Sequence, residues 1–287
     1  MRTYLDCIPC FFKQALEASR LSGLKELQQR EVLNKIAEFI PSLPLEITPP
    51  EIAEKVYGIV KDICGVEDPL REFRKRANEI ALNLYPWLKR EIRNSSHSLL
   101  DALKISAGGN MIDFATLQRI SSKEVKENLG RLLNHQPPLF QFGRFYSHLL
   151  SAKKILLIGD NAGEIVFDKL LIENFPPGKE IFFAVRGGPA INDALMEDAL
   201  QVGLDRLCQI ISTGTSLPGI LLGRSSPEFQ KIFKSSDLIL AKGQGNYETL
   251  NEVKAPIFFL LQVKCQVLAT HLKVNIGEIV LFSHYLS

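Results

Sequence analysis

Short apolar runs alternate with helix-like stretches from about residue 151 to the end of the chain. Runs that are apolar almost throughout are typical of parallel strands buried on both faces, with the helical stretches between them as crossovers. Five such runs are KILLIG (154–159), EIFFAV (180–185), CQIIS (208–212), DLILA (237–241) and PIFFLLQ (256–262), and IGEIVLFS (276–283) would add an edge strand. The pattern predicts a Rossmann-like, mostly parallel sheet with helices on both faces.

The first half of the chain has helical spacing of its apolar residues and no convincing strand ladder. The longest stretch is 70–92. Asp68 and Pro69, directly before it, have the form of an N-cap followed by proline at the first helical position. The apolar positions of this stretch are Phe73, Ala77, Ile80, Ala81 and Leu84. Shorter helical patterns cover about 5–21, 24–39, 50–63 and 122–133. We predict an α/β protein with an all-helical lobe over 1–150, which contributes to a cleft, and a Rossmann-like domain over 151–287.

Composition and charge exclude several classes of function. The 34 basic and 32 acidic residues leave a formal charge of +2, which is too balanced for nucleic-acid binding. No apolar run approaches the roughly 20 residues of a membrane span, and the N-terminus does not resemble a signal peptide. Five cysteines, an odd number, fit a reducing compartment better than a disulfide framework. We expect a cytoplasmic protein without a membrane or nucleic-acid partner; the sequence does not predict its oligomeric state.

Asp160 and Asn161 follow the first predicted strand directly and precede a helix-like pattern. Either residue could be a helix N-cap and nothing more. The loop after the second strand, however, places Asn192 and Asp193 before another helix, and neighbouring parallel strands would bring Asp160, Asn161 and Asp193 within reach of one ion. Because these ligands are all oxygens, the set favours Mg²⁺ or Mn²⁺ over zinc.

The loop AKGQGNYETL offers a site for an anion. Lys242 ends a buried strand, and the glycines after it leave backbone N–H groups open to a phosphoryl group, although a tight turn with a solvated lysine is the plain explanation. The predicted substrate-binding residues of this loop and of the other strand ends are Arg186, Ser212, Thr213, Gly214, Gly243 and Asn246.

Two further motifs lie in the helical half. Asn110 and Asp113, in SAGGNMIDF, form either a tight turn between helices or a contribution of this half to the substrate site. Cys7 and Cys10 form a C-x-x-C, but a structural zinc would need a second matched pair of ligands, which the sequence does not offer. Two cysteines packed on a helix explain this motif at least as well, so we assign them no catalytic role.

Six motifs, taken in order, resemble those of the metal-dependent damage-control phosphatase family, formerly domain of unknown function 89. They are YLDCIPCF, AGGNMIDF, GDNAGEIVFD, GGPAINDALMEDA, TGTSLPG and AKGQGNYETL. The resemblance implies a helical lobe joined to a Rossmann-like domain, and divalent-metal-dependent removal of phosphate from small phosphometabolites. The metal-holding residues of the family match Asp160, Asn161 and Asp193, and its strand-end lysine matches Lys242.

These observations lead to the hypothesis of a phosphomonoester hydrolase that uses Mn²⁺, Mg²⁺ or another divalent transition ion as Lewis acid. Catalysis would rest on Asp160, Asn161, Asp193 and Lys242, with a small phosphorylated metabolite as substrate. One alternative is a covalent route with Asp160 as nucleophile, although alanine at position 162 breaks the DxD spacing of many such enzymes. Another is a non-catalytic, metal-dependent protein that binds phosphometabolites.

Overall fold

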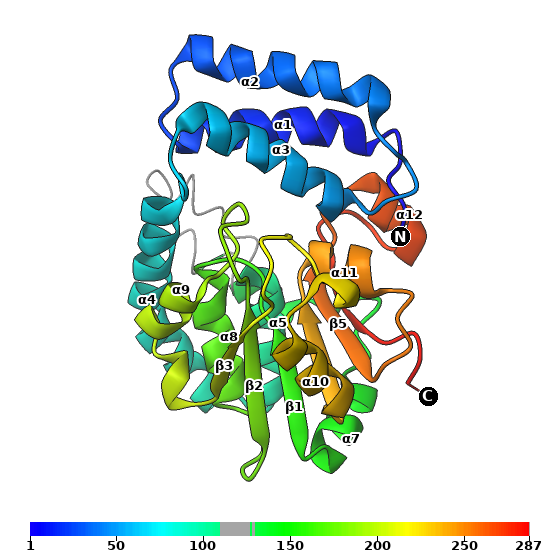
Figure 1. The fold of residues 1–287 in the computed structure, drawn as a ribbon. Coiled ribbons are helices and arrows are strands. Elements are labelled where there is room, and N and C mark those ends of the chain that lie inside the picture. Colours follow the sequence, from blue (N-terminus) through cyan, green and yellow to red (C-terminus); the bar gives the residue numbers. More distant parts are fainter. Residues whose placement is uncertain (110–126, 128–129, 287) are drawn as a thin grey trace.

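A six-stranded sheet with strand order β3-β2-β1-β4-β5-β6 forms the centre of the molecule (Figure 1). The computed structural model describes residues 1–109, 127 and 130–286. Strands β1 to β5 are parallel, and β6 runs antiparallel to β5. The strands are β1 (Lys154–Ile158), β2 (Glu180–Val185), β3 (Gln209–Ser212), β4 (Leu238–Lys242), β5 (Ile257–Gln262) and β6 (Ile279–Phe282). The predicted fold class is confirmed, and the sixth run is the edge strand.

Helices cover both faces of the sheet, as the apolar strands require. Ile155 and Leu157 of β1 belong to a core formed with α4, α5, α7 and α8, whereas Leu156 and Ile158 face α10, α11 and α12. These helices are α4 (Arg71–Asn94), α5 (Ser98–Gly108), α7 (Phe142–Ser151), α8 (Glu164–Ile172), α10 (Pro227–Ser235), α11 (Gln244–Leu250) and α12 (Gln266–Leu272), and the short α9 (Met196–Gln201) follows the loop after β2. Burial on both faces explains why the strands read as continuous apolar runs.

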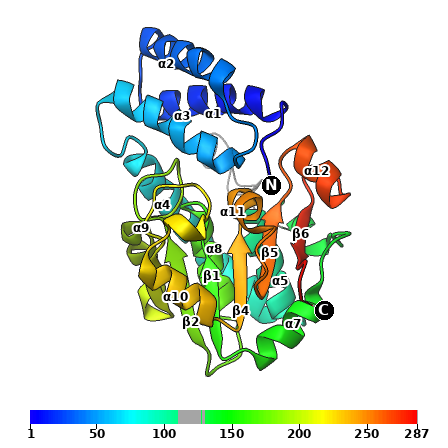
Figure 2. The same cartoon turned by 45° about the vertical axis from the view of Figure 1, so that its right-hand side comes forward.

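The first three helices form a separate layer with its own core (Figures 1 and 2). They are α1 (Cys7–Leu21), α2 (Glu26–Phe39) and α3 (Pro49–Cys64), close to the predicted ranges. Figure 2 shows α1 to α3 above the end of the sheet where α11 begins. The predicted division at residue 150 stays a prediction. Residues of α4, α5 and α7 pack in one core with the sheet. The predicted helix over 122–133 lies mostly outside the described residues.

The start of α4 differs from the prediction. The helix begins at Arg71 with Leu70 as N-cap, so the proposed cap at Asp68 is wrong. The Asp68 carboxylate instead accepts two hydrogen bonds from the Arg74 guanidinium, at 2.8 and 2.7 Å. A side chain that binds a residue six positions along the chain is not available to cap the first turn.

Two polar side chains lie on the buried face of α4, while Phe73 and Ile80 of the predicted apolar face are only partly buried. Arg74 donates from Nε to Asp198 of α9 at 2.9 Å, and Asn78 donates to the other oxygen of Asp198 at 3.0 Å. Asn78 also accepts a hydrogen bond from the backbone N–H of Gly163 at 2.7 Å. This hydrogen-bonded network connects α4 to the loop after β1.

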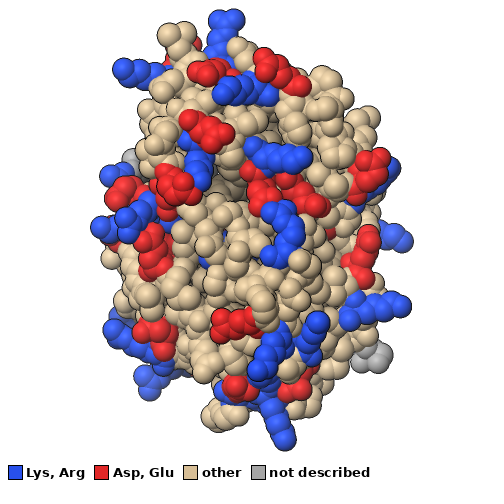
Figure 3. Space-filling view, viewed as in Figure 1, with Lys and Arg blue, Asp and Glu red and all other residues tan. Residues whose placement is uncertain are grey.

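Charges of both signs are mixed over the surface seen in Figure 3, and neither sign forms a continuous region there. This face fits the balanced charge of the sequence. No helix within the described part of the chain is long and apolar enough to cross a membrane.

The network at Arg74 yields a test of the packing between α4 and α9. Arg74→Met should lower the free energy of unfolding by about 3–5 kcal/mol, because Asp198 would be left buried without its cation. Urea unfolding measures this loss. Arg71→Met is the matched control, since exposed Arg71 binds Glu197 at the surface and its loss should hardly change the urea midpoint. Equal effects of the two exchanges would contradict the assigned role of Arg74.

Candidate active site at the ends of the central strands

The loops after β1 and β2 are joined by backbone hydrogen bonds, which bring the predicted metal ligands together. Ala194 N–H donates to the carbonyl of Asp160 at 2.8 Å, and Ala162 N–H donates to the carbonyl of Asn192 at 2.9 Å. Asn161 and Asp193 form an isolated antiparallel bridge between these bonds. The expected convergence of Asp160, Asn161 and Asp193 is therefore present in the structure.

Their side chains form a linked polar group. The amide nitrogen of Asn161 donates to Asp160 Oδ2 and to Glu164 Oε1, both at 2.9 Å. Both bonds use the nitrogen, and neither engages the amide oxygen. Arg186 Nε donates to Asp193 Oδ2 at 2.6 Å, so the guanidinium holds the second aspartate in place.

The carboxyl groups here are buried and close to one another. Burial raises the pKa of Asp160, and the charges of Lys264, Arg186 and Lys242 act against that rise. Burial raises the pKa of Glu164 to about 8, with the Asp160 charge as the next cause. Burial also raises the pKa of Asp193 to about 7, although Arg186 opposes the shift. Burial thus disfavours the ionised form of all three carboxyl groups, in spite of the nearby cations.

Glycine is required after β4, where the chain passes against Asp160. Gly243 has a φ of 79°, and a Cβ built on it would lie 2.1 Å from Asp160 Oδ2. Any side chain at this position would displace the carboxylate. The position predicted to bind a phosphoryl group therefore contacts the candidate metal ligand directly.

Asn246 and Arg186 connect three strand ends. Asn246 Nδ2 donates to the carbonyls of Gly159 and Lys242, at 3.1 and 2.6 Å, and its Oδ1 accepts from Arg186 at 3.1 Å. Arg186 also donates to the carbonyl of Gly219 at 3.1 Å. Both residues thus support the loops, and their predicted contact with substrate stays a prediction.

Lys242 is fully buried, so the alternative of a solvated lysine in a tight turn is wrong. Its ammonium group donates to Asp168 Oδ1 and, at 3.0 Å, to the carbonyl of Ser106. Ser106 Oγ donates to the same Asp168 oxygen at 2.6 Å. The Lys242 charge still lowers the pKa of Asp160 and of Glu164, so it acts on the site electrostatically.

The loop after β3 packs on the loop after β2. Gly187 N–H donates to the carbonyl of Thr215 at 2.9 Å, and a Cβ on Gly187 would lie 2.5 Å from the backbone of Gly214. Thr213 is buried, and Ser212 Oγ accepts from Gly214 N–H at 3.1 Å. The contacts of these three predicted substrate residues are thus made within the loops, and their binding role stays a prediction.

Three charged residues of this region were missed in the sequence. Glu164 and Asp168 are four residues apart and therefore lie on one side of α8, a helix whose only other charged residue is Lys169, and this spacing was a usable signal for buried polar contacts. Lys264 follows β5, and its charge lowers the pKa of Asp160. Its position just after a strand was the signal available for it.

Other predicted residues lie elsewhere. Asn110 and Asp113 are outside the described residues, so their placement stays a prediction. Cys7 and Cys10 begin α1, and both are free thiols. Burial raises the pKa of Cys7 to about 11 and raises that of Cys10 as well. At neutral pH both are thiols, the less reactive form.

The donor set fits a hard divalent cation. Within residues 1–109, 127 and 130–286 no three His, Cys, Asp or Glu side chains are arranged to hold a metal ion. A cation at Asp160 and Asp193 would therefore need the amide oxygen of Asn161 and further oxygens from water or substrate. Mg²⁺ and Mn²⁺ accept such mixed oxygen sets, and a bound cation would stabilise the ionised form of the buried carboxyl groups.

Known proteins resemble this chain over almost its whole length. Residues 3–280 match the model of the damage-control phosphatase ARMT1-like domain. A damage-control phosphatase of Pyrococcus horikoshii is 32% identical over 98% of this chain and 97% of its own, and one of Archaeoglobus fulgidus is 34% identical over 87% and 86%. An uncharacterized protein of Methanocaldococcus jannaschii is 33% identical over 96% of this chain and 93% of its own.

The fold agrees as well. The crystal structure of a protein of the DUF89 family from Pyrococcus horikoshii superposes with a TM-score of 0.90, covers 99% of both chains and is 30% identical. A family model that matches residues 3–280, together with relatives that are 32% and 34% identical, identifies the family. The chain belongs to the damage-control phosphatase family.

Proposed function

We propose that the protein is a divalent-metal-dependent phosphatase that hydrolyses phosphomonoesters of small metabolites, damaged or surplus ones among them. The observation that carries the proposal is the convergence of Asp160, Asn161 and Asp193 at the ends of β1 and β2, against Gly243 at the end of β4. Relatives named damage-control phosphatases support it. A crevice at the carboxyl ends of parallel strands is the usual ligand site of this kind of sheet.

Each residue of the site has a distinct task in this proposal. Asp160, Asn161 and Asp193 would hold the cation, while Arg186 keeps Asp193 oriented through its 2.6 Å hydrogen bond. The chemistry supplied by a bound divalent cation is Lewis acidity toward the phosphoryl oxygens. Gly243 lets the backbone come close to the reacting group, because it carries no side chain.

Lysines at the ends of β4 and β5 supply positive charge. Lys242 is held in one position by Asp168 and Ser106, so no reorganisation is needed when negative charge develops on the phosphoryl group. Exposed Lys264 lies within electrostatic range of Asp160 and would attract the phosphate ester from solvent. Buried Lys242 would thus act in the transition state, and exposed Lys264 would act in binding.

Metal dependence is tested at Asp160. Asp160→Ala removes one of two anionic ligands, so Mn²⁺ affinity measured by calorimetry should fall at least tenfold and Mn²⁺-dependent hydrolysis of an aryl phosphate should be lost. Asp237→Ala is the matched control, because this exposed aspartate lies at the opposite end of β4. Unchanged Mn²⁺ affinity in folded Asp160→Ala would exclude Asp160 as a ligand. Mn²⁺ binding by the wild-type protein without hydrolysis of the aryl phosphate would favour the non-catalytic alternative.

The role of Lys242 has to be separated from its effect on stability. Lys242→Met should reduce kcat by about a hundredfold, the scale of one lost preorganised contact, while Mn²⁺ binding persists. It also leaves Asp168 buried without a cation, which destabilises the fold. The double variant Lys242→Met/Asp168→Asn should recover thermal stability but not kcat. Recovery of kcat together with stability would assign Lys242 a purely structural role.

The two thiols of the C-x-x-C take part in no step of the proposed mechanism. The double exchange Cys7→Ser and Cys10→Ser should leave kcat within a few-fold of wild type, because both thiols are protonated at neutral pH and an oxygen-bound cation needs no thiolate. Steady-state kinetics beside circular dichroism and the thermal midpoint is the measurement. Loss of turnover in a protein of unchanged stability would instead indicate a redox or second-metal role.

A further inference from the structure

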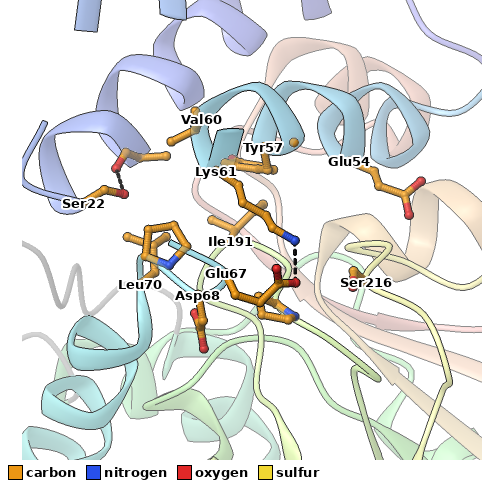
Figure 4. Close-up of a pocket in the computed structure, with 14 residues that line it drawn as sticks. Ser22, Glu54, Tyr57, Val60, Lys61, Glu67, Asp68, Leu70, Ile191 and Ser216 are labelled. Carbon is orange, nitrogen blue, oxygen red and sulfur yellow. Dashed lines mark hydrogen bonds and ion pairs between the residues drawn. The ribbon is translucent and has the colours of Figure 1, made fainter. Parts of the chain in front are cut away.

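A cavity of about 220 Å³ lies between the helical layer and the loops at the ends of the strands (Figure 4). Its upper wall comes from α1 and α3, its side from the connection between α3 and α4, and its lower wall from the loops after β2 and β3. In Figure 4, Tyr57 lies on the α3 side, and Ile191 and Ser216 lie on the loops that face it. The cavity is thus enclosed by the two parts of the fold together.

The loop that forms the lower wall also carries a candidate metal ligand. Ile191 lines the cavity two residues before Asp193, and the turn between them is closed by a hydrogen bond from Asp193 N–H to the carbonyl of Ala190 at 2.9 Å. Ile191 has a φ of 51°, a left-handed conformation that a β-branched residue rarely takes. Such strain persists where surrounding structure enforces it and is concentrated at functional sites. The loop therefore shapes the cavity and places Asp193 at once.

Tyr57 gives a second link between the cavity and the site. Burial raises the pKa of the Tyr57 phenol, and the charge of Asp193 raises it further. The phenol of a cavity residue is thus within electrostatic range of the carboxylate. Asp160 and Asp193 do not line the cavity themselves, and Ile191 and Tyr57 connect it to Asp193.

The charged groups at the rim are already paired. Lys61 forms an ion pair with Glu67, which Figure 4 marks, and Asp68 accepts from Arg74 at 2.7 Å. Glu54 accepts from Arg224 at 2.8 Å. A charged ligand group would have to displace one of these partners, so the rim does not favour phosphate or carboxylate.

Apolar groups form most of the remaining wall, with Ala18, Val60, Leu70 and Pro189 beside the ring of Tyr57, and Ser22 and Ser216 add two hydroxyl groups. A cavity of about 150 Å³ is already large enough to bind benzene. The 220 Å³ observed here fits one ring or a short branched chain and is too small for a nucleoside. An open-chain polyol would lose more hydrogen bonds to water than the two serine hydroxyls of this wall replace.

We propose that this cavity binds the organic part of the phosphoester, and that it selects a compact, uncharged and largely apolar group of about the size of one ring. The inference rests on the proposed phosphatase function, because it assumes that the phosphate lies at Asp160 and Asp193. The residues at the strand ends then carry out the hydrolysis, and the helical layer selects the substrate.

The test compares benzyl phosphate with ribose 5-phosphate, both esters of primary alcohols, so that their leaving groups have similar basicity. With Mn²⁺ present, kcat/KM should be at least about tenfold higher for benzyl phosphate. Gly58 lines the cavity on α3, and a Cβ there meets nothing within 4 Å. Gly58→Leu should therefore fill the cavity without strain and raise KM for benzyl phosphate about tenfold, with a smaller effect on methyl phosphate.

Gly143→Leu is the matched control, because it makes the same exchange at an open, exposed position of α7. It should keep the wild-type values. A preference for ribose 5-phosphate, or equal losses for benzyl and methyl phosphate in Gly58→Leu, would overturn the inference. Binding of benzylphosphonate, measured by calorimetry in wild type and Gly58→Leu, tests the cavity without turnover. Absence of hydrolysis of all esters would refute the proposed function, and absence of selective benzylphosphonate binding would refute the cavity assignment.

Discussion

The adjacency of β2, β1 and β4 is the constraint on which the rest of the site depends. The chain leaves β1 toward β2 on one side, and β4 lies on the other, so the strand order reverses beside Asp160. In register, parallel strands end at one edge, and the residues that follow them meet there. The contact is close enough that a Cβ on Gly243 would collide with the Asp160 carboxylate. A slip by one residue would turn these side chains to the other face.

Buried charge is the second determinant. Asp193 is held by Arg186 and Asp168 by Lys242, and each of these pairs has further hydrogen bonds to the backbone or to a hydroxyl. Such pairs are tolerated in a low-dielectric interior because their hydrogen bonds replace those of water. Asp160 and Glu164 share Asn161 as donor instead. The proposed cation would add positive charge beside these two carboxyl groups.

The helical part of the chain is coupled to this edge at two levels. Asn78 of α4 accepts from Gly163 N–H, where α8 begins, and Arg74 holds Asp198 beyond the second loop. Above them, α1 and α3 close the cavity beside Ile191. The sheet thus fixes the reactive groups, while the helices fix the space around them. This separation would let the wall of the cavity change without disturbing the carboxylates.

The sequence by itself determined the strands, the parallel sheet and the meeting of Asp160, Asn161 and Asp193. Burial on both faces leaves a local apolar pattern, and polar residues directly after such runs must lie at the edge of the sheet. Only the tertiary structure decided which charges pair. Arg74 and Asp198 are 124 positions apart, and Lys242 and Asp168 are 74 apart, so no local spacing indicates either contact. The same pairing took Asp68 from its expected role as helix cap and buried Lys242 beneath the site, because a buried charge is stable only beside a partner that the fold brings to it.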